Sequence, residues 1–164
     1  MPDCEIRPAT SRDIPAILEL QERNLRVNGG ALSVRFSREF FEKAISEMPI
    51  VIARNEGQVV GYVVSTPRTA QAHDPIVKAM LDAYAGTPGA YNYGPICVAK
   101  EFRGRGLALV MFEQLKAQLP GLEGFTFIRA DNESSISFHT KMGMREVAEF
   151  VQGDTKYIVV AYMG

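Results

Sequence analysis

The sequence contains no tryptophan and only two cysteines, Cys4 and Cys97, among its 164 residues. Two cysteines that do not form a CxxC pair argue against a disulfide framework and against a structural zinc site. The longest apolar runs, such as residues 157–163, are far too short to span a bilayer. An excess of one charge is also lacking, because the formal net charge is −1. We therefore expect no metal, no nucleic-acid partner and no membrane association.

The composition fits a globular protein. With 46% hydrophobic residues in a chain of 164, we expect one domain over residues 1–164 that buries roughly 70% of its unfolded surface. Residues Met1 to Glu5 lack a basic segment followed by an apolar one, so we expect no secretory signal and a reduced, cytoplasmic setting. Cys97 lies in an apolar stretch and is expected to be a small buried hydrophobic residue.

Hydrophobic periodicity predicts the order β-α-α-β-β-(α)-β-α-β-α-β-β, which implies a mixed sheet with helices on both faces. The predicted strands cover residues 4–9, 50–53, 59–64, 91–98, 125–130, 145–151 and 157–161. The predicted helices follow a capping pair at Thr10 and Asp13, follow Ser37, lie near 76–84, run from Leu107 to Leu119, and follow Asn132 or Ser134. The first helix is expected to continue to the breaker Asn28-Gly29-Gly30. The apolar stripes expected in the core are Ile14, Ile17, Leu18 and Leu25, then Phe40, Phe41, Ala44, Ile45 and Met48, then Leu107, Val110, Met111, Leu115 and Leu119.

Two short segments indicate special backbone geometry. Asn55-Glu56-Gly57 between two apolar runs predicts a hairpin turn. Gly94-Pro95 falls inside the strand predicted over 91–98, where a proline cannot donate to a ladder. We expect this strand to carry a bulge or to splay from a neighbour there.

The segment from Val98 to Ala108 is the most informative part of the chain. It predicts a strand end, a turn containing Arg103-Gly104-Arg105-Gly106, and the first turn of a helix. A helix N-terminus presents unpaired N–H groups and about half a positive charge. The two glycines let the backbone approach a ligand closely. This combination is typical of a phosphate site.

The motif Arg103-x-x-Gly106-x-Ala108, five residues after the apolar Val98, resembles the central signature of the GCN5-related N-acetyltransferase (GNAT) superfamily. A second block, from Asn132 to Met144, is similar to the family's Asn-x-x-Ser/Ala-x-x-Phe/Leu-Tyr-x-Lys-x-Gly-Phe. One helix and one strand separate the blocks, as in the family. The resemblance covers essentially the whole chain. It implies an α/β (α+β) fold with a mixed, mostly antiparallel sheet of about seven strands, helices on both faces, and strands four and five splayed.

The resemblance also implies acetyl-CoA as co-substrate and direct transfer of its acetyl group to a primary amine in a ternary complex. Backbone N–H groups near Ile96 would stabilise the oxyanion, which is worth on the order of 3 kcal/mol. The splayed strand would pair with pantetheine, and the glycine turn would hold the pyrophosphate. The residues implied in binding acetyl-CoA are Ile96, Cys97, Val98, Arg103, Gly104, Arg105, Gly106, Leu107, Ala108, Asn132, Ser135, His139 and Lys141.

The sequence departs from the family at two catalytic positions. The tyrosine that protonates the leaving thiolate is replaced by His139, which can also donate a proton near neutral pH. Tyr93, Tyr91 and Tyr84 are the alternative acids. The glutamate base of histone-type members is replaced by Asn92, which leaves the base unassigned. Glu101 is nearby, but it is expected on the CoA side of the strand and is not favoured.

The acceptor amine is the least determined part. By analogy with the family it would contact the Asn28-Gly29-Gly30 loop, residues 67–89 and the turn at 152–154. The charges in these segments show no preference: Arg26, Arg35, Arg68, His73, Asp74 and Asp154. A protein N-terminus, a lysine, an amino acid, a polyamine and a drug amine all remain candidates, as does transfer of a larger acyl group. The alternative function is a non-catalytic acyl-CoA sensor. The apolar strand from Tyr157 to Tyr162 is expected to be an exposed edge that could pair two subunits.

Overall fold

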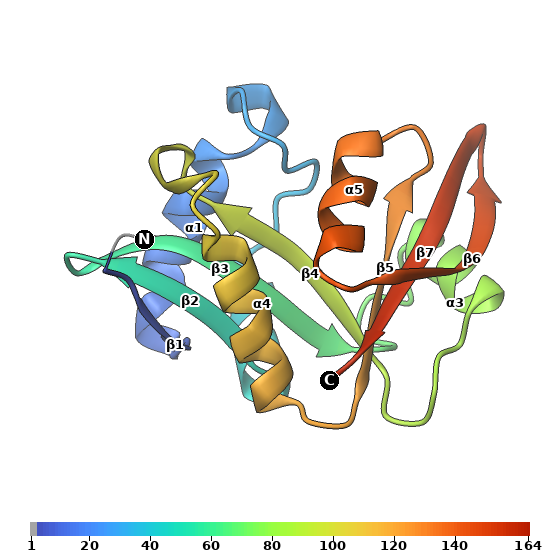
Figure 1. The fold of residues 1–164 in the computed structure, drawn as a ribbon, viewed down its shortest axis with the longest axis horizontal. Helices are drawn as coiled ribbons and strands as arrows, with labels where there is room; N and C mark the ends of the chain where they lie inside the picture. Colours follow the sequence, from blue (N-terminus) through green and yellow to red (C-terminus); the bar gives the residue numbers. More distant parts are fainter. Residues whose placement is uncertain (1–2) are drawn as a thin grey trace. The chain divides into compact units, whose positions relative to one another are not determined.

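The seven strands form one mixed sheet in the order β1-β2-β3-β4-β5-β7-β6 (Figure 1). The computed structural model describes residues 3–164. Met1 and Pro2, part of the segment in which no secretory signal is expected, lie outside the described residues. The helices are α1 (Ile14–Arg23), α2 (Arg38–Glu47), α3 (Pro75–Ala83), α4 (Leu107–Gln118) and α5 (Glu133–Lys141). The strands are β1 (Glu5–Pro8), β2 (Ile50–Asn55), β3 (Gln58–Pro67), β4 (Tyr91–Val98), β5 (Glu123–Arg129), β6 (Arg145–Gln152) and β7 (Thr155–Met163). The predicted sheet of about seven strands is confirmed.

The chain divides into two compact units. The first comprises Met1–Thr66 and Gly94–Gln118, and the second comprises Pro67–Tyr93 and Leu119–Gly164. The boundaries fall at the end of β3 and inside β4, so both units contribute residues to β4. A single domain over residues 1–164 stays a prediction.

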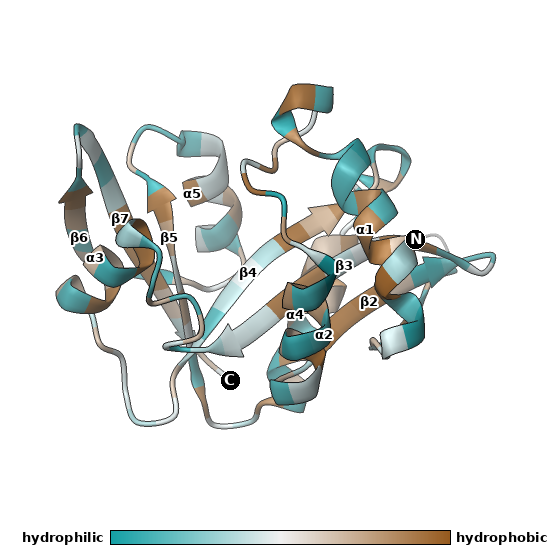
Figure 2. Ribbon diagram, turned by 180° about the vertical axis from the view of Figure 1, so that it is seen from behind, coloured by the Kyte–Doolittle hydropathy of each residue, from teal (hydrophilic) through white to brown (hydrophobic). Residues whose placement is uncertain are grey.

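In the first unit, β1, β2 and β3 are antiparallel, with Ile6 opposite Ala53 and Val51 opposite Val63. Glu56 and Gly57 take positive φ in the turn between β2 and β3, which confirms the predicted hairpin. Helix α4 covers one face of these strands, and α1 with α2 covers the other (Figures 1 and 2). Because both faces are covered, β2 is apolar and buried without alternation over residues 50–53.

Helix α1 ends four residues earlier than predicted from its glycine breaker. The capping box of Thr10 and Asp13 is present and begins a 3-10 turn, Ser11–Asp13, that leads directly into α1. At its end, however, the buried Asn24 side chain donates to the Leu20 carbonyl at 2.8 Å, and Leu25 enters the core from extended backbone. A separate 3-10 turn, Arg26–Asn28, then leads into Gly29. The buried face of α1 therefore includes Leu20 and Gln21, whereas Leu18 is half-buried.

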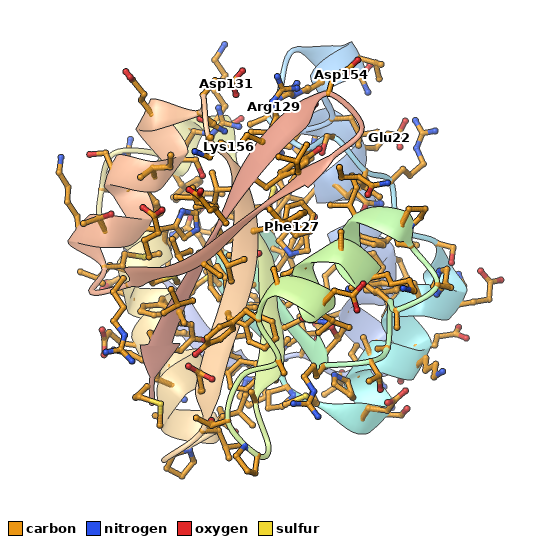
Figure 3. The ribbon with its side chains drawn as sticks, turned by 90° about the vertical axis from the view of Figure 1, so that its right-hand side faces the viewer. Glu22, Phe127, Arg129, Asp131, Asp154 and Lys156 are labelled. Atoms are coloured by element: carbon orange, nitrogen blue, oxygen red, sulfur yellow. The ribbon has the colours of Figure 1, made fainter. Side chains whose placement is uncertain are left out.

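In the second unit, β7 lies between β5 and β6 and is antiparallel to both. Helix α3 packs over β6 on one face of these strands, and α5 lies on the other (Figure 3). The expectation that the closing strand from Tyr157 to Tyr162 is an exposed edge is wrong. All six of its residues are buried, because β7 is paired on both sides and covered on both faces. The edge strand is β6, which alternates exposed and half-buried residues along much of its length.

The ladder between β4 and β5 is short, as predicted from Gly94-Pro95. Among the described residues it is parallel and consists of Tyr91 opposite Gly124 and Asn92 opposite Phe125. Gly94 then takes a φ of 100°, which turns the strand away from regular β geometry. The backbone beyond Tyr93 belongs to the first unit.

Candidate functional site

The glycine turn before α4 has the geometry expected of an anion-binding helix start. A 3-10 turn over Lys100–Phe102 precedes it, and Gly104 and Gly106 have φ values of 74° and 78°. Arg103 to Gly106 are exposed, and a Cβ on either glycine would meet no atom within 4 Å. Glycine is therefore required here by the backbone conformation and not by crowding. The first N–H groups of an α-helix have no acceptor within the helix, and those of α4 open onto this exposed turn.

The Arg103 side chain is held by two groups of the first unit. Its Nε donates to the Val98 carbonyl at 3.0 Å, and its guanidinium also donates to Oδ1 of Asn24. Asn24 is buried and closes α1, as described above. Arg103 thus connects the end of β4 to the end of α1. Arg105, which stacks on the Phe102 ring at 5.6 Å, is the arginine of the turn whose charge is not used in this bridge.

We expect Arg103 and Asn24 to be energetically coupled. Replacing Arg103 by alanine leaves the buried Oδ1 of Asn24 without its charged donor, and Asn24→Ala removes the same bond from the other side. Each change should lower the free energy of unfolding by about 1.5–3 kcal/mol. In a double-mutant cycle by urea unfolding, the second change should cost much less once the first is present. Additive losses would show that the bond contributes no stability.

The second half of β4 carries the predicted oxyanion and pantetheine residues. Cys97 is buried, as predicted, and burial raises the pKa of its thiol to about 11, so it is inert at neutral pH. Ile96 and Val98 are half-buried and lie on the opposite face of the strand from Cys97. Immediately after the strand, the N–H of Ala99 donates to the Val60 carbonyl at 2.8 Å, which fixes the start of the glycine turn on β3.

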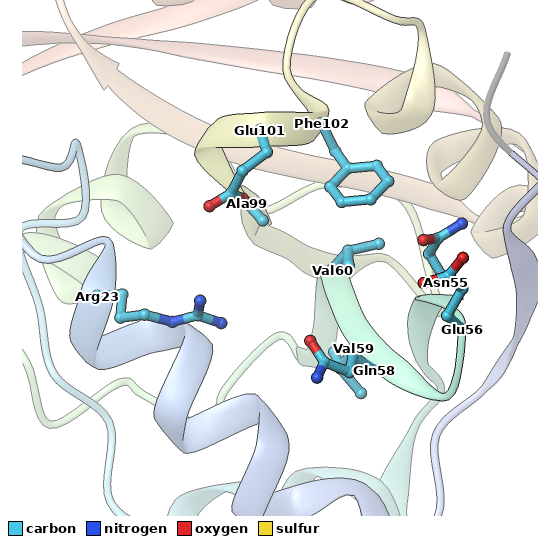
Figure 4. Close-up of a pocket in the computed structure, with 9 residues that line it drawn as sticks. All are labelled: Arg23, Asn55, Glu56, Gln58, Val59, Val60, Ala99, Glu101 and Phe102. Atoms are coloured by element: carbon cyan, nitrogen blue, oxygen red, sulfur yellow. The ribbon is translucent and has the colours of Figure 1, made fainter.

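A pocket of about 320 Å³ lies beside the glycine turn in the first unit (Figure 4). Arg23, Glu56 and Glu101 give it charges of both signs, and Val60 and Phe102 line it with apolar surface. Glu101, the carboxylate not favoured as a base, belongs to this pocket. The sequence did not predict this pocket, because the residues that line it come from three segments that are distant in the chain.

The second block of predicted residues lies on α5 in the second unit. Asn132 caps the helix, with Oδ1 accepting from the Ser135 N–H at 3.2 Å, as predicted. His139 is buried in the last turn, and its Nδ1 lies 2.7 Å from the Ser135 carbonyl oxygen and 3.3 Å from Ser135 Oγ. The Tyr93 ring of β4 packs edge-on against the imidazole with 5.6 Å between ring centroids. Lys141 is exposed.

The candidate acids differ in their surroundings. Burial lowers the pKa of His139, and the Ser135 carbonyl opposes this shift without reversing it. Burial raises the pKa of Tyr93 far above its ordinary value. Tyr91 shares a 2.5 Å hydrogen bond with the Tyr162 hydroxyl, and Tyr84 donates to the buried carboxylate of Glu123 at 2.5 Å. Tyr84 and Tyr91 therefore already have structural partners.

Asn92, where the resemblance implies a glutamate base in other members, has a structural role in the second unit. Its Nδ2 donates to the Arg68 carbonyl at 3.1 Å and to the Pro67 carbonyl at 3.4 Å. These bonds attach β4 to the start of the connection after β3. Within residues 3–164, no group of three or more His, Cys, Asp or Glu side chains is placed to hold a metal ion. In the same residues no helix is long and apolar enough to cross a membrane.

The charges expected near the acceptor amine are largely engaged within the protein. Arg35 pairs with Glu22 through two bonds of 2.9 and 2.7 Å, Arg68 donates to the Ala85 carbonyl at 2.6 Å, and Asp74 caps α3 by accepting from Ile76 N–H. Asp154 lies at the exposed tip of the β6–β7 hairpin (Figure 3). Arg35, Arg68 and Asp74 therefore already have hydrogen-bond partners within the protein.

The sequence profile of the acetyltransferase (GNAT) family matches residues 14–144. A search of curated proteins finds no significant match. Among solved structures, the fold is similar to ribosomal-protein-S18-alanine N-acetyltransferase from Escherichia coli (TM-score 0.67, 15% identity, 98% of this chain and 93% of that chain covered). It is also similar to a putative acetyltransferase from Salmonella typhimurium solved with its cofactor acetyl-CoA (TM-score 0.68, 15% identity, 98% and 94% covered). A third similar structure is ribosomal-protein-alanine N-acetyltransferase from Brucella melitensis (TM-score 0.63, 21% identity, 98% and 99% covered). At these identities the likeness concerns the fold.

Proposed function

Because the chain belongs to the acetyltransferase (GNAT) family, we propose that it transfers the acetyl group of acetyl-CoA to a primary amine by direct attack in a ternary complex. The observation that carries the proposal is the exposed turn of Gly104 and Gly106, which leads with positive φ into the N-terminus of α4. A diphosphate is the ligand for which such a turn is suited, since backbone N–H groups and the helix dipole both favour an anion.

We propose these roles for the predicted residues. The backbone from Arg103 to Ala108 binds the pyrophosphate, and the backbone of Ile96 to Val98 binds pantetheine and the oxyanion. Asn132, Ser135 and Lys141 on α5 complete the acetyl-CoA contacts. His139 protonates the leaving thiolate, with Tyr93 as the alternative acid. The whole chain acts as one N-acetyltransferase domain. The relatives that acetylate ribosomal-protein alanine make a protein N-terminus one candidate acceptor among amines.

Calorimetry with acetyl-CoA tests the binding part of the proposal, and the chain offers a matched pair of variants. Gly106→Ala and Gly121→Ala each force alanine into a φ near 75° with no atom within 4 Å of the new Cβ. Both should lose a similar stability of about 1–2 kcal/mol. Only Gly106→Ala should weaken acetyl-CoA binding, by about tenfold or more, because its methyl group lies where the diphosphate approaches.

An absence of heat with wild-type protein and acetyl-CoA at micromolar concentrations would overturn the proposal. Equal acetyl-CoA affinities of the two variants would show that the glycine turn does not bind the diphosphate. Release of free thiol is then measured over a panel of amines, peptides with free N-termini included. Binding without thiol release over the whole panel would favour the acyl-CoA sensor.

A further inference from the structure

We propose that His139 accepts a proton before it donates one: its Nε2 takes the proton of the attacking nitrogen and then passes it to the sulfur of CoA. The inference rests on the proposed function for its place in the reaction. It joins the two departures from the family, a histidine in place of the acid and an amide in place of the base, in one side chain.

The position of the proton follows from the contact between His139 and Ser135. Nδ1 of the imidazole lies 2.7 Å from the Ser135 carbonyl oxygen, one helical turn earlier on α5. A carbonyl oxygen only accepts hydrogen bonds, so Nδ1 must carry the hydrogen. The Ser135 hydroxyl, at 3.3 Å from the same nitrogen, is the more distant contact. In the neutral ring, Nε2 therefore has a free electron pair and no proton to give.

The surroundings of the ring favour its neutral form. His139 is 8% exposed. From β4 the ring is faced by Tyr93, and from its own helix by Phe138 at 5.1 Å between centroids. Tyr162 of β7 packs behind Tyr93 at 5.8 Å. The Tyr93 phenol packed against the ring is titratable, and burial raises its pKa. Glu133 and Lys141, the charged residues of α5, are exposed. Burial accordingly lowers the pKa of His139.

The reaction sequence balances around this resting state. A neutral amine forms the C–N bond with the thioester carbon, and the tetrahedral intermediate carries an oxyanion and a positive nitrogen. Nε2 takes one proton from that nitrogen, which gives an imidazolium whose Nδ1–H remains on the Ser135 carbonyl. The C–S bond then breaks, the sulfur takes the proton from Nε2, and the neutral ring is restored. A carboxylate at position 92 is not needed for this step.

Nitrogen NMR of the full chain tests the resting state directly. The chain has two histidines, and His73 is exposed in a loop, so a His73→Gln variant assigns both signals. Long-range proton–nitrogen spectra at pH 7.5 should show His139 neutral, with the proton on Nδ1 and a titration midpoint below the ordinary value of about 6.5. A proton on Nε2, or a charged ring at pH 7.5, would overturn the inference.

Two variants separate the role of the ring from its structure. Ser135→Ala removes the hydroxyl but keeps the carbonyl, so the Nδ1–H tautomer should persist; a switch to Nε2–H would show that the hydroxyl sets the tautomer and would contradict the argument. In the wild type, kcat/KM should decrease as the pH is lowered through the midpoint that NMR gives for His139, since the imidazolium cannot accept a proton. His139→Gln should lose about 10²- to 10⁴-fold in turnover and lose this acidic limb.

The two levels of the proposal fail in different ways. An absence of thiol release over the amine panel removes the transferase and, with it, the catalytic role of His139, whatever the tautomer. The inference is wrong if the enzyme is active but His139 carries its resting proton on Nε2. It is also wrong if the acidic limb of the kcat/KM profile persists in His139→Gln. In both cases the proposed transferase activity is unaffected.

Discussion

Gly30→Ala should unfold the loop that follows α1 and should be among the most destabilising single substitutions in the first unit. A Cβ on Gly30 would lie 2.0 Å from the carbonyl oxygen of Asn24, 2.2 Å from its carbonyl carbon and 2.5 Å from its Cα. All three are backbone atoms, so no side-chain rotation relieves the clash. The Asn24 carbonyl also accepts from Leu32 N–H at 2.9 Å, and Asn24 must stay in place to hold Arg103. We expect a loss of about 3 kcal/mol or more, from overpacking together with the broken backbone bond.

Gly29→Ala is the matched control for this prediction. Gly29 has a φ of 88°, but a Cβ there would meet nothing within 4 Å, so its cost is the left-handed conformation alone, about 1–2 kcal/mol. Urea unfolding of both variants measures the difference, and calorimetry should show weaker acetyl-CoA binding for Gly30→Ala, because the loop holds Arg103 beside the glycine turn. If Gly30→Ala costs no more than Gly29→Ala, the close approach to Asn24 does not determine the loop.

Gly124→Ala should have a comparable effect in the second unit. Gly124 pairs with Tyr91 on one side and with Tyr162 on the other. The two tyrosine hydroxyls meet at 2.5 Å, so the rings enclose the glycine. A Cβ on Gly124 would lie 2.4 Å from both Cζ and the hydroxyl oxygen of Tyr162. Tyr162 is buried and packs edge-on against Tyr91 and Tyr93, so its ring has no free space to move into. We expect a loss of about 3 kcal/mol, at the upper end for overpacking.

A second substitution identifies the cause. In a Tyr162→Ala background the ring is gone, and Gly124→Ala should then cost well under about 1 kcal/mol, within the usual range for a strand position without a clash. The free energies of unfolding of the four proteins give the coupling between the two sites. An equal cost of Gly124→Ala in both backgrounds would show that the loss comes from the strand itself. Because Tyr93 packs against both Tyr162 and His139, the His139 NMR signals should also shift in Gly124→Ala.

The features that could be predicted from the sequence depend on chemistry between near neighbours. Ser37 caps α2 by accepting from Phe40 N–H, and Asn132 caps α5 in the same way. The turn at Glu56 and Gly57 needs residues that tolerate positive φ. The turn at Gly104 and Gly106 likewise needs residues that tolerate positive φ. In each case the partner lies within four residues, so the residue types indicate the structure directly.

The features that were missed depend on partners distant in the chain. The sequence predicts that Arg103 adds positive charge for a phosphate, but it does not indicate the bond to Asn24, because 79 residues separate the two. The helix α1 ends at Arg23 because Asn24 is buried where it bonds to Arg103. Gly29 and Gly30 lie several residues further along the chain, so they do not mark this end of the helix. The position of β7 was misjudged for a related reason. A continuous apolar strand indicates burial, but the sequence does not say which strands lie beside it.

The placement of β7 also affects the order in which the second unit can assemble. The β6–β7 hairpin closes through a short turn at Gly153, so these strands can meet early. The pairs between β5 and β7 join residues far apart in the chain, from Arg129 with Tyr157 to Glu123 with Met163, with α5 and β6 between them. Pairing strands that are separated by so many residues is slow compared with forming a hairpin. During refolding, the apolar side of β7 that awaits β5 is therefore an open template for other chains, and dilution should protect the yield at this stage.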